Sequence, residues 1–263
     1  MTHIATLSGG KDSTAMLDLL LRDKKPLDHI VFYDTLHEFA AMYEYIAKLG
    51  EYFRARYGKE ITILKPAMSF EECVFGRISR GENKGAIRGL PAPQTQGFCA
   101  WRREAKVAPF ERWLKAQSFD EYKIYIGYTT DETRRRMDGN EFLYPLIDDY
   151  NMSEADCTAY LKEREMENPL YRYFSRTGCY FCPAQSKRAF YQVWKNFKPE
   201  WEYMKRIEAE LLALRDGGEA VLNTSWFAGN LTCTDMEAEF IRLSRQGSLA
   251  FDDEPLKDCF CKI

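Results

Sequence analysis

The stretch His3-Ile-Ala-Thr-Leu-Ser-Gly-Gly-Lys-Asp-Ser-Thr14 decides the fold, because an apolar run passes through a glycine loop into a helix. The run His3 to Leu7 predicts a short strand, and the apolar residues from Ala15 to Leu20 recur with helical spacing. Ligands of α/β proteins bind at such loops, where a strand ends and a helix begins. The stretch therefore predicts an α/β fold with a ligand site near its N-terminus.

The loop itself has the chemistry of a phosphate site. Its residues are Ser8, Gly9, Gly10, Lys11, Asp12 and Ser13. The glycines let the backbone approach an anion, the first N–H groups of the helix point outward unpaired, and the lysine adds a positive charge. The spacing of a Walker A loop is absent, so different phosphate chemistry is expected.

The next apolar runs predict strands that alternate with helices. Strands are expected at His29 to Tyr33, Ile61 to Leu64 and Lys123 to Tyr128, with a helix from about Glu38 to Tyr57. Asp34 sits at the carboxyl end of the second strand. This alternation indicates βαβ units and hence a doubly wound, mainly parallel sheet.

The middle and the end of the chain have a different pattern. Residues 77–97 read as a long loop, and residues 77–106 carry seven basic against two acidic side chains, which suits a phosphate-rich ligand. Ser153 is expected to cap a helix over 154–164, and residues 184–214 to form two helices broken at Pro199. We expect a nucleotide-binding α/β domain over 1–175, followed over 176–263 by a cysteine-containing helical extension with an acidic tail.

Composition limits the classes of function. The formal net charge is −3, so a polyanionic partner would be held by a local basic patch. No apolar run approaches the roughly 20 residues that a bilayer requires, and the first residues lack the pattern of a secretory signal. We therefore expect a cytoplasmic protein without membrane contact. Its eight cysteines then need an explanation other than stable disulfides.

At this point the sequence resembles a known family, the PP-loop ATP pyrophosphatases, and within it the phosphoadenosine phosphosulfate (PAPS) reductase-like branch. The loop Ser8 to Ser13 resembles the PP-loop. Four further segments resemble motifs of the branch: Phe32-Tyr33-Asp34-Thr35 with Glu38-Phe39, Gly127 to Arg135, Tyr144 to Asp148 with Asn168 to Tyr171, and Gly178-Cys179 with Cys182-Pro183. The resemblance covers residues 1 to about 210 and implies the fold of the adenine nucleotide α-hydrolases.

The resemblance implies that ATP and Mg²⁺ bind at the loop and that ATP is cleaved to AMP and pyrophosphate. Lys11 and Asp12 would act in catalysis, together with Ser8, Gly9, Gly10 and Ser13 as nucleotide contacts. Asp34 would lie near the adenosine, and Arg134 and Arg135 would add positive charge. Sulfur, delivered by a donor protein, would then replace an oxygen of the adenylylated acceptor, a nucleobase or a DNA backbone phosphate.

The cysteines divide into groups. The spacing of Cys179 and Cys182 lets two thiolates reach one metal. Cys99 precedes a segment that resembles the cluster-binding segment of iron–sulfur members, which suggests a [4Fe–4S] cluster on three cysteines. A fourth ligand from the C-terminal tail, Cys259 or Cys261, would close the cluster. Zinc is the main alternative to the cluster, and the cysteines could also be plain thiols or a redox disulfide. Cys73 and Cys157 are expected in the core, and Cys233 is unassigned.

Two other functions fit the sequence. True PAPS reductases usually have a degenerate loop, whereas this loop is intact, and their C-terminal cysteine lies in a Glu-Cys-Gly-x-His signature. This chain instead ends with Cys259-Phe-Cys261, and either cysteine would be the nucleophile of a reductase acting on PAPS or adenylyl sulfate with an electron donor protein. The third hypothesis is a nucleotide- or nucleic-acid-binding module without turnover. A homodimer is compatible with each.

Overall fold

The computed structural model describes residues 1–91 and 99–245. Within them the chain forms two compact units. Among the described residues, the first comprises 1–66 and 105–178, and the second comprises 67–91, 99–104 and 179–245. The division into domains 1–175 and 176–263 stays a prediction, to which the structure adds that 67–104 groups with the second unit.

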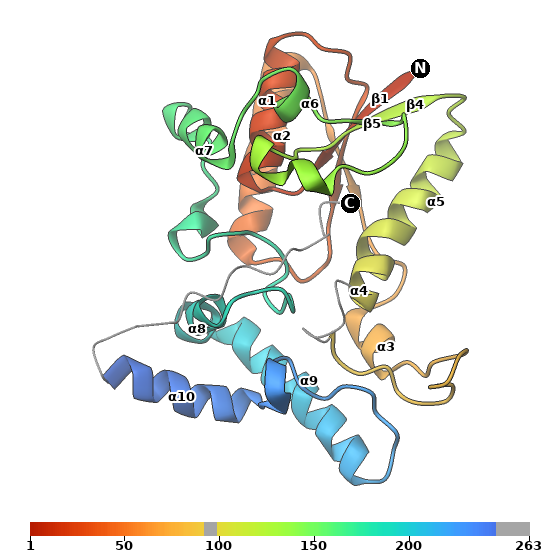
Figure 1. Cartoon of the computed structure of the whole chain (residues 1–263), viewed down its shortest axis with the longest axis vertical. Coiled ribbons are helices and arrows are strands. Elements are labelled where there is room, and N and C mark those ends of the chain that lie inside the picture. The colour runs from red at the N-terminus through yellow and green to blue at the C-terminus, as the bar shows by residue number, and fades with distance from the viewer. Residues whose placement is uncertain (92–98, 246–263) are drawn as a thin grey trace. The chain divides into compact units, whose positions relative to one another are not determined.

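The first unit is an α/β fold (Figure 1). Its strands are β1 (Thr2–Leu7), β2 (His29–Tyr33), β3 (Ile61–Leu64), β4 (Tyr122–Tyr125) and β5 (Phe142–Leu143). Its helices are α1 (Lys11–Arg22), α2 (Ala40–Tyr57), α5 (Ala108–Gln117), α6 (Pro145–Asp148), α7 (Glu154–Glu163) and the short η2 (Thr130–Arg135) and η3 (Pro169–Arg172). A π-helical turn, η1 (Arg103–Val107), precedes α5.

The five strands form one parallel sheet in the order β3-β2-β1-β4-β5. Ile4 of β1 pairs with His29 on one side and with Ile124 on the other. The chain winds outward from β1 in both directions, so the order reverses between β1 and β4. This confirms the doubly wound sheet expected from the sequence and places its switch point beside the glycine loop.

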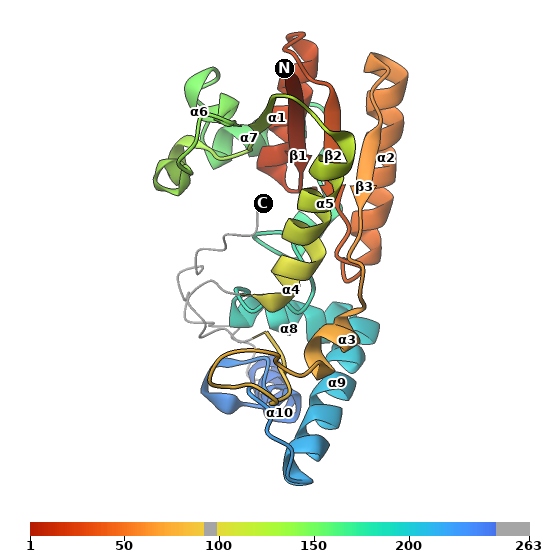
Figure 2. The same cartoon turned by 90° about the vertical axis from the view of Figure 1, so that its right-hand side faces the viewer.

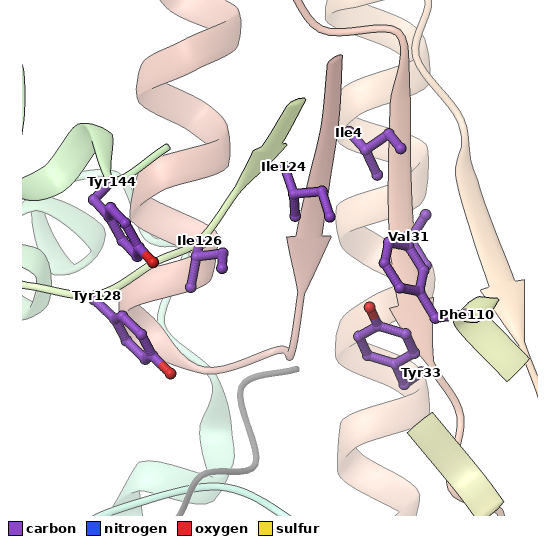
Figure 3. Packing of buried hydrophobic residues seen from close by; sticks show 8 residues of the cluster. All are labelled: Ile4, Val31, Tyr33, Phe110, Ile124, Ile126, Tyr128 and Tyr144. Atoms are coloured by element: carbon purple, nitrogen blue, oxygen red, sulfur yellow. The ribbon is translucent and has the colours of Figure 1, made fainter. Parts of the chain in front are cut away.

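Helices cover both faces of the sheet. In Figure 1, α1 and α2 lie on one side and α5 on the other, and Figure 2 shows α5 in front of β1 and β2. On the α5 face, Phe110 packs with Ile4, Val31 and Ile124 in a buried cluster (Figure 3). The strands are continuous hydrophobic runs because helices cover both faces of the sheet. Burial of these apolar side chains stabilises the sheet from which the glycine loop projects.

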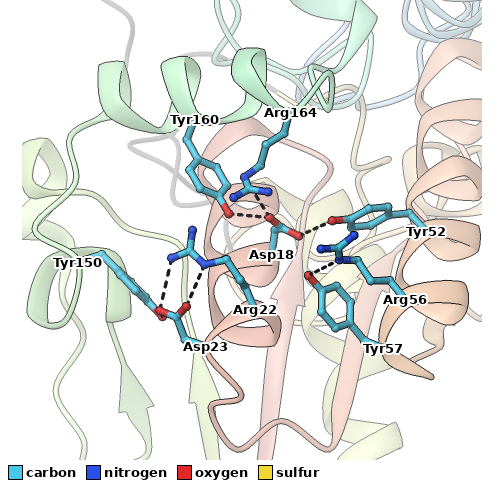
Figure 4. Close-up of polar contacts among 9 residues, drawn as sticks. All are labelled: Asp18, Arg22, Asp23, Tyr52, Arg56, Tyr57, Tyr150, Tyr160 and Arg164. Carbon is cyan, nitrogen blue, oxygen red and sulfur yellow. Dashed lines mark hydrogen bonds and ion pairs between the residues drawn. The ribbon is translucent and has the colours of Figure 1, made fainter.

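A buried carboxylate ties α1 to its neighbouring helices (Figure 4). Asp18 of α1 is fully buried and accepts hydrogen bonds from Tyr52 Oη at 3.0 Å and Tyr160 Oη at 2.6 Å. The guanidinium of Arg164 lies 3.6 Å from the same carboxylate. Tyr52 belongs to α2 and Tyr160 to α7, so one side chain joins three helices of the unit.

The second unit is helical, with α3 (Phe70–Phe75), α4 (Ala100–Arg102), α8 (Lys187–Asn196), α9 (Lys198–Asp216), η4 (Ala228–Asn230) and α10 (Cys233–Arg245). Its core is aromatic: the rings of Phe70 and Phe181 stack with centroids 4.4 Å apart, and Phe181 stacks on Trp226 at 5.2 Å. The indole N–H of Trp226 donates to the Met204 carbonyl at 3.0 Å. Aromatic stacking and a satisfied indole thus hold α3 against α9.

Several boundaries differ from the sequence prediction. The expected strand over Lys123 to Tyr128 ends at Tyr125, since the Tyr128 N–H turns back to the Ile126 carbonyl. The two C-terminal helices break at Phe197, and Pro199 stands in the first turn of α9, where no N–H is needed. Helix α10 was not expected at all. Ser153 caps α7 as predicted.

No helix among residues 1–91 and 99–245 is long and apolar enough to span a bilayer.

Candidate functional site

The glycine loop is held in place by a distant segment of the first unit. Gly9 has a left-handed backbone, with φ of +72°, and its carbonyl accepts a hydrogen bond from Asn168 Nδ2 at 2.8 Å. Tyr171 Oη accepts the N–H of Lys11 at 2.9 Å. Asn168 also caps η3 through the Leu170 N–H. Asn168 and Tyr171 are therefore structural parts of the loop.

The two serines hold the loop from within. Ser8 Oγ and Ser13 Oγ lie 2.9 Å apart, and Ser13 Oγ accepts the Ser8 N–H at 3.1 Å. The Gly10 N–H is directed at Ser8 Oγ at 3.3 Å. These bonds shape the turn between β1 and α1 before any ligand arrives, so little ordering free energy is needed on binding.

Lys11 is the cation of the loop. Its ammonium forms an ion pair with Glu154 and lies 5.2 Å from the ring centroid of Tyr171. Asp12, the second residue of α1, is buried. A phosphate bound at the α1 N-terminus would meet the Lys11 ammonium and would compete with Glu154 for it.

The second wall of the site follows β4, the strand next to β1 at the switch point. A Cβ on Gly127 would stand 2.9 Å from both the Cα and the N of Ser13, so this backbone packs directly on α1. Thr129 is fully buried, and its Oγ1 has no hydrogen-bond partner within the described part of the chain. Loops after β1 and β4 thus flank the crevice in which doubly wound proteins bind ligands.

Gly127 gives a test of this packing. We expect Gly127→Ala to abolish nucleotide binding at the loop, because the new methyl group would displace the backbone of Ser13 rather than a flexible side chain. Gly50→Ala in α2 is the matched control, since its Cβ would meet only Ile61 at 3.8 Å. Calorimetric titration with ATP measures both variants. Wild-type affinity in Gly127→Ala would contradict the placement of the site.

Asp34, expected near the adenosine, is buried at the carboxyl end of β2. Its Oδ1 accepts from the Leu36 N–H at 2.8 Å and from Tyr43 Oη at 2.9 Å, and Lys65 lies 3.6 Å from Oδ2. Burial and the neighbouring carboxylate raise the pKa of Tyr43. The carboxylate therefore shapes the turn after β2, and its contact with adenosine stays a prediction.

Glu38 lies in the same turn. Its Oε1 accepts from Thr35 Oγ1 at 2.7 Å. Burial raises the pKa of the Glu38 carboxyl, an effect that the positive charge of Lys106 partly offsets. Two carboxylates thus stand close together after β2. The sequence analysis quoted Glu38 only as part of a motif and assigned it no role.

The arginines after β4 are placed differently from one another. Arg135 pairs with Glu132 of its own helix turn and lies 5.1 Å from the Tyr128 ring centroid. Arg136 pairs with Asp148. Arg134 is exposed. The nucleotide contacts expected of Arg134 and Arg135 stay predictions, and Arg135 has a local structural role besides.

The three candidate metal ligands belong to the second unit. Cys179 and Cys182 form a turn in which the Cys182 N–H donates to the Cys179 carbonyl at 3.0 Å. The pKa of Cys99 is raised to about 11, mainly by burial and in smaller part by the nearby Cys182 and Cys73 thiols. Cys73, expected only in the core, is therefore also a neighbour of this group.

These thiols do not form a recognisable ligand set. Among residues 1–91 and 99–245, no three His, Cys, Asp or Glu side chains gather closely enough to hold a metal ion. The metal-binding roles of Cys99, Cys179 and Cys182 therefore stay predictions. Cys259 and Cys261, the candidate redox cysteines or fourth ligands, lie outside the described residues. Cys157 is fully buried, as expected for a core residue.

Comparison with known families identifies the class of protein. The family model for the phosphoadenosine phosphosulfate reductase domain matches residues 2–185. The chain therefore belongs to this family, and the resemblance noted in its sequence motifs is confirmed. The match includes the glycine loop, the β4 loop and the Asn168 to Tyr171 segment that holds the glycine loop.

Two uncharacterized proteins of Methanocaldococcus jannaschii are similar in sequence. One is 26% identical over 230 residues, which cover 82% of this chain and 43% of the relative. The other is 27% identical over 206 residues, which cover 74% and 44%. This chain thus spans less than half the length of these curated relatives.

Two solved structures have partly similar folds. One is the PAPS reductase from Candida auris, solved as a phosphate complex. It aligns with a TM-score of 0.47 and 20% sequence identity, and the alignment covers 68% of this chain and 81% of the reductase. The other is the U34-tRNA thiolase NcsA from Methanococcus maripaludis with its [4Fe–4S] cluster. It aligns with a TM-score of 0.40 and 14% sequence identity, and the alignment covers 93% of this chain and 72% of the thiolase. The sheet order of this chain itself defines the doubly wound fold.

Proposed function

We propose that this chain binds ATP with its phosphates on residues 8–13 and cleaves it between the α and β phosphates to adenylylate a substrate oxygen. The observation that supports this most is the convergence of three phosphate-binding elements at the sheet's switch point. These are the left-handed Gly9 backbone, the N-terminus of α1 and the ammonium of Lys11. The loop keeps every residue type that ATP cleavage in this superfamily is expected to need.

In the proposed first step, a substrate oxygen attacks the α-phosphorus and the bond to the β-phosphate oxygen breaks. Pyrophosphate leaves, and AMP becomes attached to the substrate oxygen. Lys11 and the α1 N–H groups stabilise the charge that develops on pyrophosphate. Mg²⁺, a cation that prefers oxygen ligands, would be held by the phosphates and the Asp12 carboxylate and would supply further positive charge.

In the proposed second step, a sulfur nucleophile forms a bond to the activated atom, and the bond from that atom to the adenylylated oxygen breaks. AMP leaves with this oxygen, and the product carries sulfur in its place. The sulfur is sulfide or the outer sulfur of a persulfide on a donor protein. With a persulfide, a further thiol attacks the inner sulfur of the donor, the S–S bond to the outer sulfur breaks, and a disulfide remains while the product keeps the outer sulfur. The acceptor class is nucleic acid, at a nucleobase oxygen or a backbone phosphate.

Product analysis tests the proposal. The full chain is incubated with ATP, Mg²⁺, sulfide and either transfer RNA or duplex DNA as acceptor. We expect AMP and pyrophosphate in equal amounts with thiolated nucleic acid. ATP that remains intact with both acceptors while sulfite is released from PAPS would overturn the proposal.

That last outcome would favour a second function, reduction of PAPS or adenylyl sulfate, which the family match supports. A cysteine thiolate would attack the sulfonyl sulfur and break its bond to the nucleotide phosphate. A second thiol would then release sulfite and leave a disulfide, which a thiol donor reduces. Sulfite formation without ATP consumption, lost in Cys259→Ser or Cys261→Ser, identifies this reaction.

The prediction that three cysteines bind a metal can be tested separately. If Cys99, Cys179 and Cys182 bind a [4Fe–4S] cluster, protein purified without oxygen is brown, contains iron and acid-labile sulfide, and loses both in Cys182→Ser. Cys157→Ser is the control, because this thiol is fully buried in α7. Colourless protein with stoichiometric zinc would show the rival site, and protein free of both metals would leave these cysteines as thiols.

A further inference from the structure

The ammonium of Lys11 is engaged before any nucleotide arrives. Lys11 is the first residue of α1, and its ammonium forms an ion pair with the carboxylate of Glu154, the first residue of α7. Both residues belong to the first unit. The side chain of Glu154 is half-exposed, whereas that of Lys11 is mostly buried. A negative group from a distant helix thus lies at the cation of the glycine loop.

Helix α7 is fixed where it presents Glu154 to α1. The Glu154 N–H donates to Asp131 Oδ2 at 2.8 Å, which ties the start of the helix to the segment after β4. Further along the helix, Tyr160 Oη donates to the buried Asp18 of α1 at 2.6 Å (Figure 4). The backbone is held at both points, so only the side chain of Glu154 needs to move when a ligand takes its place at Lys11.

The carboxylate of Glu154 can leave Lys11 at a small cost in free energy. It is half-exposed, and within the described residues it has no second ion pair. Water solvates the released carboxylate, and its position in the first turn of α7 keeps it near the positive end of the helix dipole. Phosphate oxygens that reach Lys11 therefore displace a weakly held partner.

The same carboxylate opposes an anion that is already bound. An ammonium has three donors, but phosphate oxygens and the Glu154 carboxylate that share them approach each other closely, and like charges at such distances repel. Glu154 therefore weakens polyphosphate binding in two ways. It occupies Lys11 in the empty loop, and it repels the ligand in the filled loop. Both effects act on pyrophosphate, the leaving group of the proposed reaction.

We propose that Glu154 is a counter-ion that promotes the release of pyrophosphate from the glycine loop. It leaves Lys11 when the phosphates of ATP bind and returns to Lys11 as pyrophosphate dissociates, so the ammonium keeps an anionic partner throughout. Glu154 is thus a positioning residue that acts through Lys11 and does not touch the reacting atoms. This inference rests on the proposed function, because it takes residues 8–13 as the phosphate site.

Calorimetric titration of the full chain with inorganic pyrophosphate and Mg²⁺ tests the proposal without turnover. Glu154→Gln keeps the size of the side chain and removes its charge. We expect its Kd for pyrophosphate to be about fivefold lower than that of the wild type, which corresponds to about 1 kcal/mol, the upper value for an exposed ion pair. Loss of a merely structural contact would instead weaken binding.

Glu163→Gln is the matched control, since Glu163 is an exposed residue of the same helix and has no ion pair in the described part of the chain. It makes the same change in net charge and should bind pyrophosphate like the wild type. Equal or weaker binding by Glu154→Gln would overturn the proposal. The same gain in Glu163→Gln, or no binding by any of the three proteins, would also overturn it.

Formation of AMP from ATP, measured in parallel, separates this proposal from the proposed function. Tighter pyrophosphate binding by Glu154→Gln, without AMP formation by the wild type, would support the counter-ion and refute ATP cleavage. AMP formation by the wild type, with equal pyrophosphate affinities of the wild type and Glu154→Gln, would do the reverse.

Discussion

Replacing Lys11 by alanine should lower the rate of AMP and pyrophosphate formation by about 10²–10³-fold, the usual effect of removing one group that stabilises developing charge in a transition state. Lys11 is the first residue of α1, and its ammonium is the only side-chain cation that the loop Ser8 to Ser13 supplies. Lys11→Arg should recover part of the rate, because it keeps the charge but changes the reach of the side chain.

Steady-state measurement of kcat and KM for ATP checks this expectation. Lys25→Ala is the matched control: Lys25 is an exposed cation of the same unit, paired with Asp149 at 3.0 Å. The control should turn over ATP like the wild type. A Lys11→Ala variant with unchanged kcat and KM would show that the loop does not hold the reacting phosphates.

Asp18→Ala should lower the free energy of unfolding by about 3 kcal/mol, because it removes the fully buried carboxylate that three donors share. The donors are the hydroxyls of Tyr52 and Tyr160 and the guanidinium of Arg164. Since Asp18 lies on α1, we also expect weaker ATP binding through loss of alignment of the helix that carries Lys11.

Asp23→Ala provides the comparison, since Asp23 lies near Asp18 on the chain but is partly exposed (Figure 4). Its bonds to Arg22 and Tyr150 are at the surface, where such pairs contribute less than about 1 kcal/mol. Urea denaturation of both variants measures the difference. Equal losses of stability would show that the Asp18 cluster does not join the three helices as described.

The sheet could be predicted from the sequence because its strands are local patterns. The runs His29 to Tyr33 and Ile61 to Leu64 were predicted with the bounds that the structure shows. The end of β4 was not, because Tyr128 is apolar in character and buried while its N–H leaves the ladder. Burial pattern alone does not distinguish a strand residue from a packed turn residue.

Helix α10 was missed although its signal is present. Its buried residues Cys233, Met236, Phe240 and Leu243 follow helical spacing, but charged residues between them lower the mean hydropathy of the stretch. A count of periodic positions would have found this helix. The hydrogen bond from the Cys233 N–H to Glu208 could not be predicted, because it joins two helices, α9 and α10.

The glycine loop could be predicted from its residue types alone. The contacts that hold it in place could not. Asn168 reaches the Gly9 carbonyl across 159 residues of sequence, and only the folded chain brings them together. The same holds for Gly127 against Ser13. For the cysteines, the sequence indicates two ligands but not the others. The spacing of Cys179 and Cys182 is typical of metal sites, yet it does not identify the further residues that would complete the coordination.

Cleavage of ATP at its α-phosphate can be followed by phosphorus NMR of ATP incubated with the full chain, Mg²⁺ and an acceptor nucleic acid. We expect the resonances of AMP and pyrophosphate to grow together as those of ATP decline, and to be absent with Lys11→Ala. Growth of ADP and inorganic phosphate in their place would contradict cleavage at the α-phosphate.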